Sequence, residues 1–390
     1  MSRARATAAL LGVAALAALA TGCVARDTVA TAAGIDVDQF CAGTGPPVLV
    51  NDACTGDVAE AIFRQAVCAC GDLTLATSVT TDGFDSRVAP WAPGGAGGDL
   101  GGNGAVSLGG MVTIGGDAIV AGAGGLQAGP MLHVQGDLDL AGPLGRSSSA
   151  ITVGGAARVG GTIDVGSLGV AGALTTAPGA IVTGAVTAAT RVTATVAVPP
   201  PCRCDPDEVL DVAQVVADHR LVNHDAALGL APDAYADVAG DVMLELPCGR
   251  YYLDRIQTTA GGSVTIRATG RTVLLIGGDV TLDGDLTVEV APGAELDLFI
   301  SGFLNLPGAV RLGDPARPRD LRLYLAAAGS INVSGGSILG GNLYAPAADI
   351  QASAPLEVFG ALLVNRLNAS AGVTVHYDRA IEVAGDRCEG

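Results

Sequence analysis

The sequence predicts a mainly β protein built as a right-handed parallel β-helix (solenoid), with a disulfide-pinned helical N-terminal cap and one helical excursion. Three observations lead to this prediction. Short runs of alternating apolar residues recur about every 20 residues, which indicates strands in repeated units. Gly accounts for 57 of 390 residues and aromatic residues for only 3%, so small aliphatic side chains must form the core. Cysteines fall into two groups on either side of a long cysteine-free stretch, as in a disulfide framework.

The first 23 residues predict export and a lipid anchor. Arg3 and Arg5 precede an apolar run over residues 8–20, which is the arrangement of a secretory signal peptide (1–22) and too short for a membrane span. The sequence Leu-Ala-Thr-Gly-Cys that ends at Cys23 resembles the lipobox of bacterial lipoproteins. This resemblance implies cleavage before Cys23 and acylation of its thiol, and the alternative is an ordinary signal peptide cut nearby. We therefore expect a protein of the bacterial cell envelope, anchored in the outer membrane by its acyl chains.

Composition divides the rest of the chain into five segments. They are a lipid-anchored tether (23–40), a Cys-rich helical cap (41–72), a first β-helix part (73–198), a Cys-containing helical excursion (199–258) and a second β-helix part with a C-terminal Cys (259–390). In the cap, Thr55 is expected to begin a helix that ends at Val67. In the excursion, Asp205 as N-cap and Pro206 after it predict a helix that ends before His224.

The two β-helix parts share one texture of short strands. In the first part, Ile114, Val134 and Val153 occupy equivalent places about 20 residues apart. In the second part, the spacing between equivalent runs, such as those ending at Ile276 and Ile300, varies between about 19 and 25 residues. This shared pattern predicts that both parts belong to one continuous rod, with the excursion packed on its side.

Each run in the second part is followed by a shorter one, as in Val280-Thr281-Leu282 and Ile331-Asn332-Val333. Two or three short strands per 20 residues are typical of a parallel β-helix. An antiparallel sandwich is the alternative, but its hairpins require no fixed phase. Coils of a β-helix stack ~4.8 Å apart, and the ends of such a stack need caps. We expect the helix over residues 55–67 to cap the N-terminal end.

Eight cysteines remain after Cys23, and an even number in an exported chain predicts disulfides. We expect pairs within the first group (Cys41, Cys54, Cys68, Cys70) and within the second (Cys202, Cys204, Cys248, Cys388). Four cysteines allow three arrangements, so the connectivity within each group stays open. The alternative is a metal site made by the two Cys-x-Cys motifs, although this spacing suits zinc poorly. We expect no metal and no cofactor.

The charge balance excludes several classes of partner. The net charge is −18, and every basic residue is Arg. An acidic chain of this kind disfavours DNA, RNA and anionic lipid. Without Lys, a nucleotide-binding Walker loop cannot be built, and the motifs Gly-x-Ser-x-Gly and His-Glu-x-x-His do not occur.

Few residues have the chemistry of a catalytic or metal site. His219 and His224 with Asp218 and Asp225 form one cluster, which we expect to be a solvated helix end. His133 and His376 lie in strands and are expected to face outward. The remaining candidates for Ca²⁺ are the pairs Asp137/Asp139 and Asp283/Asp285, and the segment Gly94-Gly-Ala-Gly-Gly-Asp99-Leu, which resembles one Ca²⁺-binding repeat. We expect the pairs to be the polar faces of strands.

Three blocks of sequence carry a resemblance to known proteins. They are Phe40-Cys-Ala-Gly-Thr-Gly with the helix and Cys-Ala-Cys that follow, Pro201-Cys-Arg-Cys-Asp-Pro-Asp-Glu, and Leu246-Pro-Cys-Gly-Arg-Tyr-Tyr leading into Pro292-Gly-Ala-Glu-Leu-Asp-Leu-Phe. Together they resemble uncharacterised bacterial envelope lipoproteins with a Gly-rich β-helix. The C-terminal half is similar to a domain of unknown function found in exported and pilus-associated proteins. The shape resembles that of the polymerising bactofilins, which lack disulfides and such a leader. The resemblance implies fold and location only.

These observations favour a lipid-anchored envelope protein with a structural or adhesive role and no catalytic activity. Its expected partners are the membrane, through the anchor, and cell-wall or surface polysaccharide or other envelope proteins. The alternative is a carbohydrate-active β-helix enzyme, a polysaccharide lyase or hydrolase. Such a site would draw on the polar residues of the second part, which are Asp254, Arg255, Asp279, Asp283, Asp285, Glu289 and Asp297.

Overall fold

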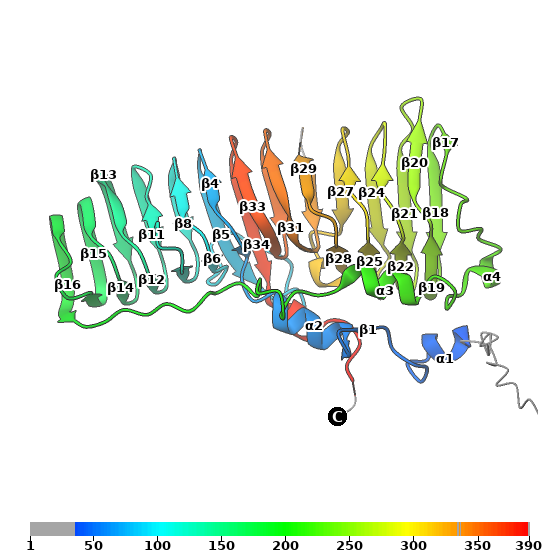
Figure 1. Cartoon of the computed structure of the whole chain (residues 1–390), viewed down its shortest axis with the longest axis horizontal. Coiled ribbons are helices and arrows are strands. Elements are labelled where there is room, and N and C mark those ends of the chain that lie inside the picture. The colour runs from blue at the N-terminus through cyan, green and yellow to red at the C-terminus, as the bar shows by residue number, and fades with distance from the viewer. Residues whose placement is uncertain (1–35, 334, 336, 389–390) are drawn as a thin grey trace, which may run out of the picture. The chain divides into compact units, whose positions relative to one another are not determined.

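The described part of the chain is a parallel β-solenoid of about 14 turns (Figure 1). The computed structural model describes residues 36–333, 335 and 337–388. Successive coils pair strand on strand in parallel, and 28 strands form one sheet that winds around the column. The fold class predicted from the 20-residue repeat is confirmed. The predicted anchor at Cys23 lies outside the described residues.

The first half of the solenoid begins with short strands of two to six residues and ends in three long ones, β13, β15 and β16. These strands are β3 (Val67–Ala69), β4 (Leu73–Leu75), β5 (Val79–Phe84), β6 (Leu100–Gly102), β7 (Val106–Leu108), β8 (Met111–Ile114), β9 (Ala118–Val120), β10 (Leu126–Gln127), β11 (Met131–Val134), β12 (Leu138–Leu140), β13 (Leu144–Val153), β14 (Ala157–Val159), β15 (Ile163–Thr176) and β16 (Val182–Thr193). In most of these strands up to β14 every second residue is buried, as in Leu73 and Leu75, so Leu, Val and Ile fill the core in layers.

The second half combines strands of four to eleven residues with the two-residue strands β17, β23 and β26. Its strands are β17 (Val238–Ala239), β18 (Val242–Leu246), β19 (Gly249–Leu253), β20 (Ile256–Thr259), β21 (Val264–Ala268), β22 (Arg271–Ile276), β23 (Val280–Thr281), β24 (Leu286–Val290), β25 (Glu295–Ile300), β26 (Leu304–Asn305), β27 (Val310–Gly313), β28 (Leu321–Leu325), β29 (Gly329–Val333), β30 (Ser337–Gly340), β31 (Asn342–Ala352), β32 (Leu356–Phe359), β33 (Leu362–Ala369) and β34 (Val373–Asp378). The 3-10 helices η1 (Pro318–Asp320) and η2 (Arg379–Val383) lie before β28 and after β34.

The coils do not follow one another in chain order. Strand β5 of the first coil pairs with β8 on one edge and with β34 of the last coil on the other. In the same way, β3 lies between β6 and β33. We call the contact of β3, β4 and β5 with β33 and β34 the joint. One half therefore extends from the joint to β16, and the other runs from β18 back to the joint.

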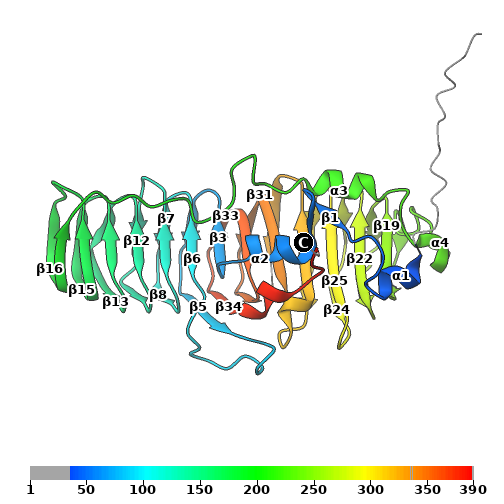
Figure 2. The same ribbon diagram turned by 90° about the horizontal axis from the view of Figure 1, so that it is seen from below.

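Residues 194–237, the return segment, connect the two halves. Figure 2 shows this segment crossing from β16 along the stacked strands to α3 (Val212–Asp218). It ends in α4 (Asp225–Leu228), beside the first strands of the second half. The rod is continuous, as expected. The excursion, however, is shorter than the predicted 199–258, because β17 to β20 are already part of the solenoid.

The helix of the return segment begins later than predicted. Its N-cap is Asp211, whose carboxylate accepts a hydrogen bond from the Gln214 amide at 2.9 Å. Residues 205–209 form only a turn. The hydroxyl of Tyr344 accepts a hydrogen bond from the Leu210 amide at 2.9 Å, which fixes the chain just before the helix. A tertiary contact thus sets the start of α3.

The N-terminal helix does not cap an end of the column. The chain enters through α1 (Val37–Cys41) and the hairpin β1 (Leu49–Val50) and β2 (Ala53–Cys54), followed by α2 (Thr55–Ile62). Helix α2 ends before the predicted Val67, because β3 begins at that residue. It contacts η2, which directly follows the last strand, so it lies beside the joint. The first coil has neighbours on both edges and offers no end to cover.

All eight cysteines form disulfides, but the predicted pairing within each group is wrong. Every bond joins one group to the other: Cys41–Cys248, Cys54–Cys388, Cys68–Cys202 and Cys70–Cys204. The prediction assumed that cysteines close in sequence are close in space. The return segment instead passes beside β3, so the two Cys-x-Cys motifs meet as a pair of disulfides. These bonds fasten the return segment to the joint, in place of the alternative metal site.

In the second half, α2 and α3 cover side chains that point outward from the column. Phe299 and Tyr324 stack with ring centroids 4.6 Å apart on neighbouring coils. Phe63, which follows α2, lies 6.2 Å from the Tyr324 ring, and α3 packs on β25. Both helices therefore extend the apolar core to the outside of these coils, and burial raises the pKa of the Tyr324 hydroxyl.

A buried ion network joins this covered side to the C-terminus. Asp297 is fully buried, and its carboxylate is 2.5 Å from a guanidinium nitrogen of Arg271 and accepts from Arg322. Arg322 also binds Glu295 at 2.9 Å, and Arg271 binds Asp386 at 2.8 Å. Burial alone would raise the pKa of Asp297, but the two arginines together lower it.

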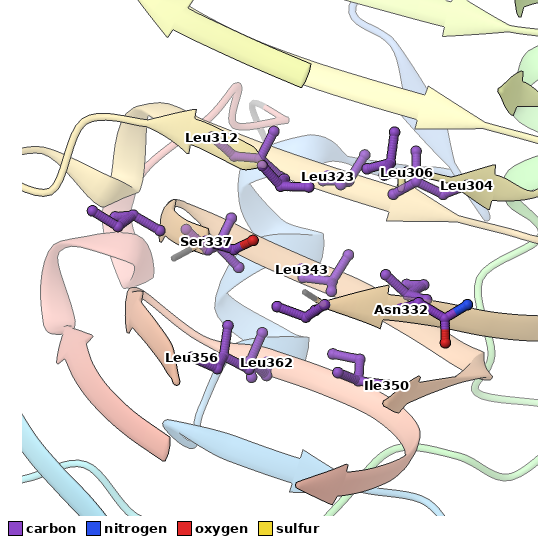
Figure 3. A pocket seen from close by; sticks show the side chains of 15 residues that line it. Leu304, Leu306, Leu312, Leu323, Asn332, Ser337, Leu343, Ile350, Leu356 and Leu362 are labelled. Atoms are coloured by element: carbon purple, nitrogen blue, oxygen red, sulfur yellow. The ribbon is translucent and has the colours of Figure 1, made fainter. Parts of the chain in front are cut away.

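A small cavity of about 50 Å³ interrupts the core of the second half (Figure 3). Its lining is almost entirely aliphatic, with Leu304 and Leu306 on one coil and Leu343 and Ile350 on another. It lies where β26 and β29 are in contact but do not pair as strands of one sheet. An apolar space of this kind stays dry. We take it as a packing fault where the ladder through β26 is interrupted, while β27 pairs with β30 and β28 with β31 past the same level.

Candidate functional site

One side of the column carries a straight row of uncharged polar side chains. The column has three sides, and the side that carries this row is made of β4, β7, β10, β20, β23, β26, β29 and the second parts of β31 and β33. The register places six outward residues in line across the joint: Asn332, Gln351, Asn368, Thr74, Ser107 and Gln127. Neighbouring members are one coil apart, which is ~4.8 Å. We call these residues, with the three described next, the neutral polar row.

The row continues beyond the cavity. Gln257, Thr281 and Asn305 are aligned in the same way on β20, β23 and β26. Because β26 contacts β29, these three lie on the same side as the other six. Phe303 precedes Asn305 by two residues and is 53% exposed. Its ring lies over Gly329, where an added Cβ would come within 2.9 Å of the ring.

The side chains of the row are available for a ligand. Each one is exposed or half-buried between core residues of its own strand, as Thr74 is between Leu73 and Leu75. Within the described residues, none of the nine side chains has a hydrogen-bond partner. An open depression lies over the middle of the row and is lined by Thr74, Ala76, Asn332, Gln351, Ala352, Ser353, Asn368, Ala369 and Ser370. The arrangement offers amide and hydroxyl groups at a regular spacing.

Charged groups flank the row without joining it. Asp349 and Arg366 face outward two residues before Gln351 and Asn368, and they form an ion pair at 3.8 Å. The amide of Asn365 donates to Asp349 at 2.7 Å. The row itself has no titratable group, so its hydrogen bonding does not depend on pH.

The predicted cluster around His219 and His224 is an end cap rather than a solvated helix end. His224 and Asp225 lie along the free edge of β19: the Arg250 amide donates to Nδ1 of His224 at 2.9 Å, and the Tyr252 amide donates to Asp225 at 3.0 Å. Burial raises the pKa of Asp225 to about 6 and lowers the pKa of His219. Both histidines are in structural roles, with His219 Nδ1 at 2.8 Å from a backbone oxygen of α3.

The other two histidines face outward, as predicted. His133 lies 2.7 Å from the Thr152 hydroxyl on the next coil. His376 on the last coil is buried, because Trp91 from the loop after β5 packs over it at 4.1 Å. Its Nδ1 is 2.7 Å from the carboxylate of Asp82 on the first coil. This contact therefore locks the joint.

The aspartates considered for Ca²⁺ support the turns between coils. Asp137 accepts a hydrogen bond from the Ala156 amide of the next coil at 2.7 Å, and Asp99 does the same for Asp117 at 2.8 Å. Asp139 instead faces Arg158, with Oδ1 2.6 Å from Nε. Asp285 accepts from the Ala309 amide at 2.8 Å. The carboxylates of Asp137, Asp139 and Asp285 thus each contact a neighbouring coil.

The polar residues of the second part do not gather at one place. Asp297 is buried in the ion network, and Glu289 faces Arg267 at 3.9 Å. Asp279 accepts from the Phe303 amide at 2.8 Å. Asp254 and Arg255 line a separate open depression with Asp233 and Asp279. The structure thus brings Asp254, Arg255 and Asp279 together in one depression and places Glu289 and Asp297 elsewhere.

The coil pairing and the polar row define a parallel β-solenoid with a row of uncharged polar side chains along one side. Residues 212–384 match a family described as a domain of unknown function, DUF7305. The match covers under half of the chain, from α3 through the second half, and the first half lies outside it. No curated protein and no solved structure matches the chain. None of the helices in the described residues is long and apolar enough to cross a bilayer.

The sequence pattern contained the signal for the row, but not its extent. The short runs Val280-Thr281-Leu282 and Ile331-Asn332-Val333 each hold one of its members at the middle position. The missing information was the coil order, since Asn368 meets Thr74 only because the last coil pairs with the first.

Proposed function

We propose that this protein is a lipid-anchored protein of the cell envelope with an adhesive role, in which the neutral polar row binds an uncharged polysaccharide. The observation that carries the proposal is the row itself: nine amide and hydroxyl side chains, one per coil, that have no hydrogen-bond partner among residues 36–333, 335 and 337–388. Sugar hydroxyls donate and accept hydrogen bonds, and so do these groups. The coil spacing of ~4.8 Å is close to the length of one sugar residue in an extended chain.

Two further features support a neutral polysaccharide over other partners. Phe303 presents an exposed ring beside Asn305, where a sugar ring can stack. The net charge of −18 disfavours acidic polysaccharides, which would be repelled at long range. A second envelope protein is the competing partner, and the polysaccharide is preferred because the members of the row are amides and hydroxyls, with Phe303 as the exposed ring beside them.

Binding to insoluble polysaccharides tests the proposal. The full chain should bind a neutral polymer, and changing Gln351→Ala with Asn368→Ala should weaken that binding at least about tenfold, since hydrogen bonds at the centre of the row are lost. The matched control is Gln135→Ala, an exposed amide at a turn outside the row. Equal binding by both variants would contradict the proposal.

The same assay separates adhesion from catalysis. An adhesive protein retains the polymer without releasing shorter sugars. Release of products that stops when Asp283 or Asp285 is changed to Asn would instead establish the carbohydrate-active enzyme.

The anchor requires its own measurement. Mass spectrometry of the N-terminal peptide should find an acylated Cys23, with two or three chains for stable attachment. An unmodified N-terminus at another residue would exclude the anchor while leaving polysaccharide binding open.

A further inference from the structure

The two ends of the solenoid differ in whether the edges of their last strands are covered. At the end of the second half, the return segment covers two of the three sides: His224 and Asp225 take the edge amides of β19, and the Pro232 and Tyr235 carbonyls accept from Asp254 and Gln257. At the other end, β16 pairs with β15 along one edge, and no described strand pairs with its other edge. Figure 1 shows β16 as the last strand of the column. We call residues 181–193 the open end.

The open end differs in composition from the rest of the chain. No Asp or Glu occurs between Asp164 and Asp205, although the chain has 39 acidic residues. Ile181, Val182 and Val192 are 67%, 41% and 46% exposed. An unpaired strand edge next to exposed apolar side chains recruits another chain. Depletion of charge is also the mark of the centre of a protein interface.

We infer that two copies of this chain associate through their open ends, β16 edge against β16 edge, around a two-fold axis. The occupant is a second copy for two reasons. Elsewhere the acidic surfaces of two copies repel, and the open end is the stretch without acid. The opposite end cannot accept β16 along β19 and β20, because the return segment already occupies those edges, so the contact joins like with like and closes as a dimer.

One charged residue, Arg191, lies at this contact and weakens the association of the two copies. Arg191 is in register with the buried Leu174, so it faces the core, and its guanidinium donates to the carbonyl of Val186 on the same coil. It therefore lies across the open core. In the dimer, two such guanidinium groups face each other, and their repulsion keeps the association reversible.

Sedimentation equilibrium of the full chain in density-matched detergent tests the inference. The chain should sediment as a concentration-dependent dimer. Changing Ile181→Glu with Val182→Glu should raise the dissociation constant at least about tenfold, because four carboxylates then meet in the contact. The matched control is Leu221→Glu, an 83% exposed apolar residue outside the open end, which should leave the dimer unchanged. Changing Arg191→Gln should tighten it.

A cross-link gives an independent readout. Thr187→Cys, exposed on β16, should form an intermolecular disulfide, and Leu221→Cys should not. The inference is overturned by a chain that stays monomeric up to its solubility limit. A dimer that survives the two glutamates, or that loosens with Arg191→Gln, would overturn it as well.

Discussion

The two halves of the solenoid place the same ion pair in different surroundings. Asp139 and Arg158 are neighbours on β12 and β14, and Asp297 and Arg322 are neighbours on β25 and β28. The side chain of Arg158 is 47% exposed, whereas that of Arg322 is fully buried beneath the covering helices. The same repeat pattern thus occurs in a half whose outer face is exposed to solvent and in a half whose outer face is covered by helices. The covering, rather than the strand, decides what a polar pair contributes.

Removing one acid from each pair should give the largest difference between the halves. Asp297→Ala leaves two buried arginines without their shared partner and should lower the free energy of unfolding by about 3–5 kcal/mol. Asp139→Ala removes an exposed pair and should cost about 1 kcal/mol or less. Urea unfolding of both variants measures this. Equal losses would mean that the covering does not exclude water.

The two disulfides between β3 and the return segment should act as one fastening. Each closes a loop of 134 residues, so one bond alone keeps that loop closed when the other is removed. Replacing all four cysteines by Ala should lower the stability by about 2–5 kcal/mol. Replacing only Cys70 and Cys204 should cost much less. Thermal unfolding under non-reducing conditions compares them, and a large loss from the single bond would refute the redundancy.

The hydroxyl of Tyr344 holds the return segment over the covered half. Tyr344→Phe should cost about 0.5–1.5 kcal/mol, because the Leu210 amide loses its acceptor. Tyr235→Phe is the control, since its hydroxyl bonds the Met243 carbonyl at the longer distance of 3.3 Å near the surface. Proteolysis within residues 194–211 should accelerate in the first variant alone.

The covered end should respond to pH, whereas the open end has no acid to titrate. Burial raises the pKa of Asp225 from 3.8 to about 6, so the folded protein binds this proton more tightly than the unfolded chain. The contribution of Asp225 to stability therefore increases as the pH falls from above 6 toward 3.8. Asp225→Asn should lose this dependence. Melting temperatures across that range measure the difference, and parallel curves would contradict it.

The repeat spacing was enough to predict a parallel β-helix, because strands of a solenoid alternate and recur locally. Local pattern also placed the helix at Thr55 and the eight disulfide-bonded cysteines. The local pattern could not predict the order of the coils, because the contact between β5 and β34 joins residues nearly 300 positions apart. The error in the cap follows from that contact, and the error in the cysteine pairing follows from the path of the return segment beside β3.

The candidate site shows the same limit. Thr281 and Asn332 stand in recognisable runs, but a row becomes a binding face only when its members are aligned. That alignment crosses the joint between Asn368 and Thr74. His224 and Asp225 were noticed as polar residues, yet their role depends on the unpaired edge of β19, which no local pattern reveals.

The disulfide connectivity has a consequence for how the chain matures. During synthesis Cys41, Cys54, Cys68 and Cys70 emerge first, and oxidation in order of emergence would pair them with one another. No native bond joins consecutive cysteines, and Cys54 must wait for Cys388, which lies 334 residues further along the chain. Native pairing therefore needs either thiols that stay reduced until Cys388 has emerged or a disulfide isomerase that exchanges early bonds. A host cell that oxidises thiols without exchanging them should therefore yield chains in which the return segment is not bonded to β3.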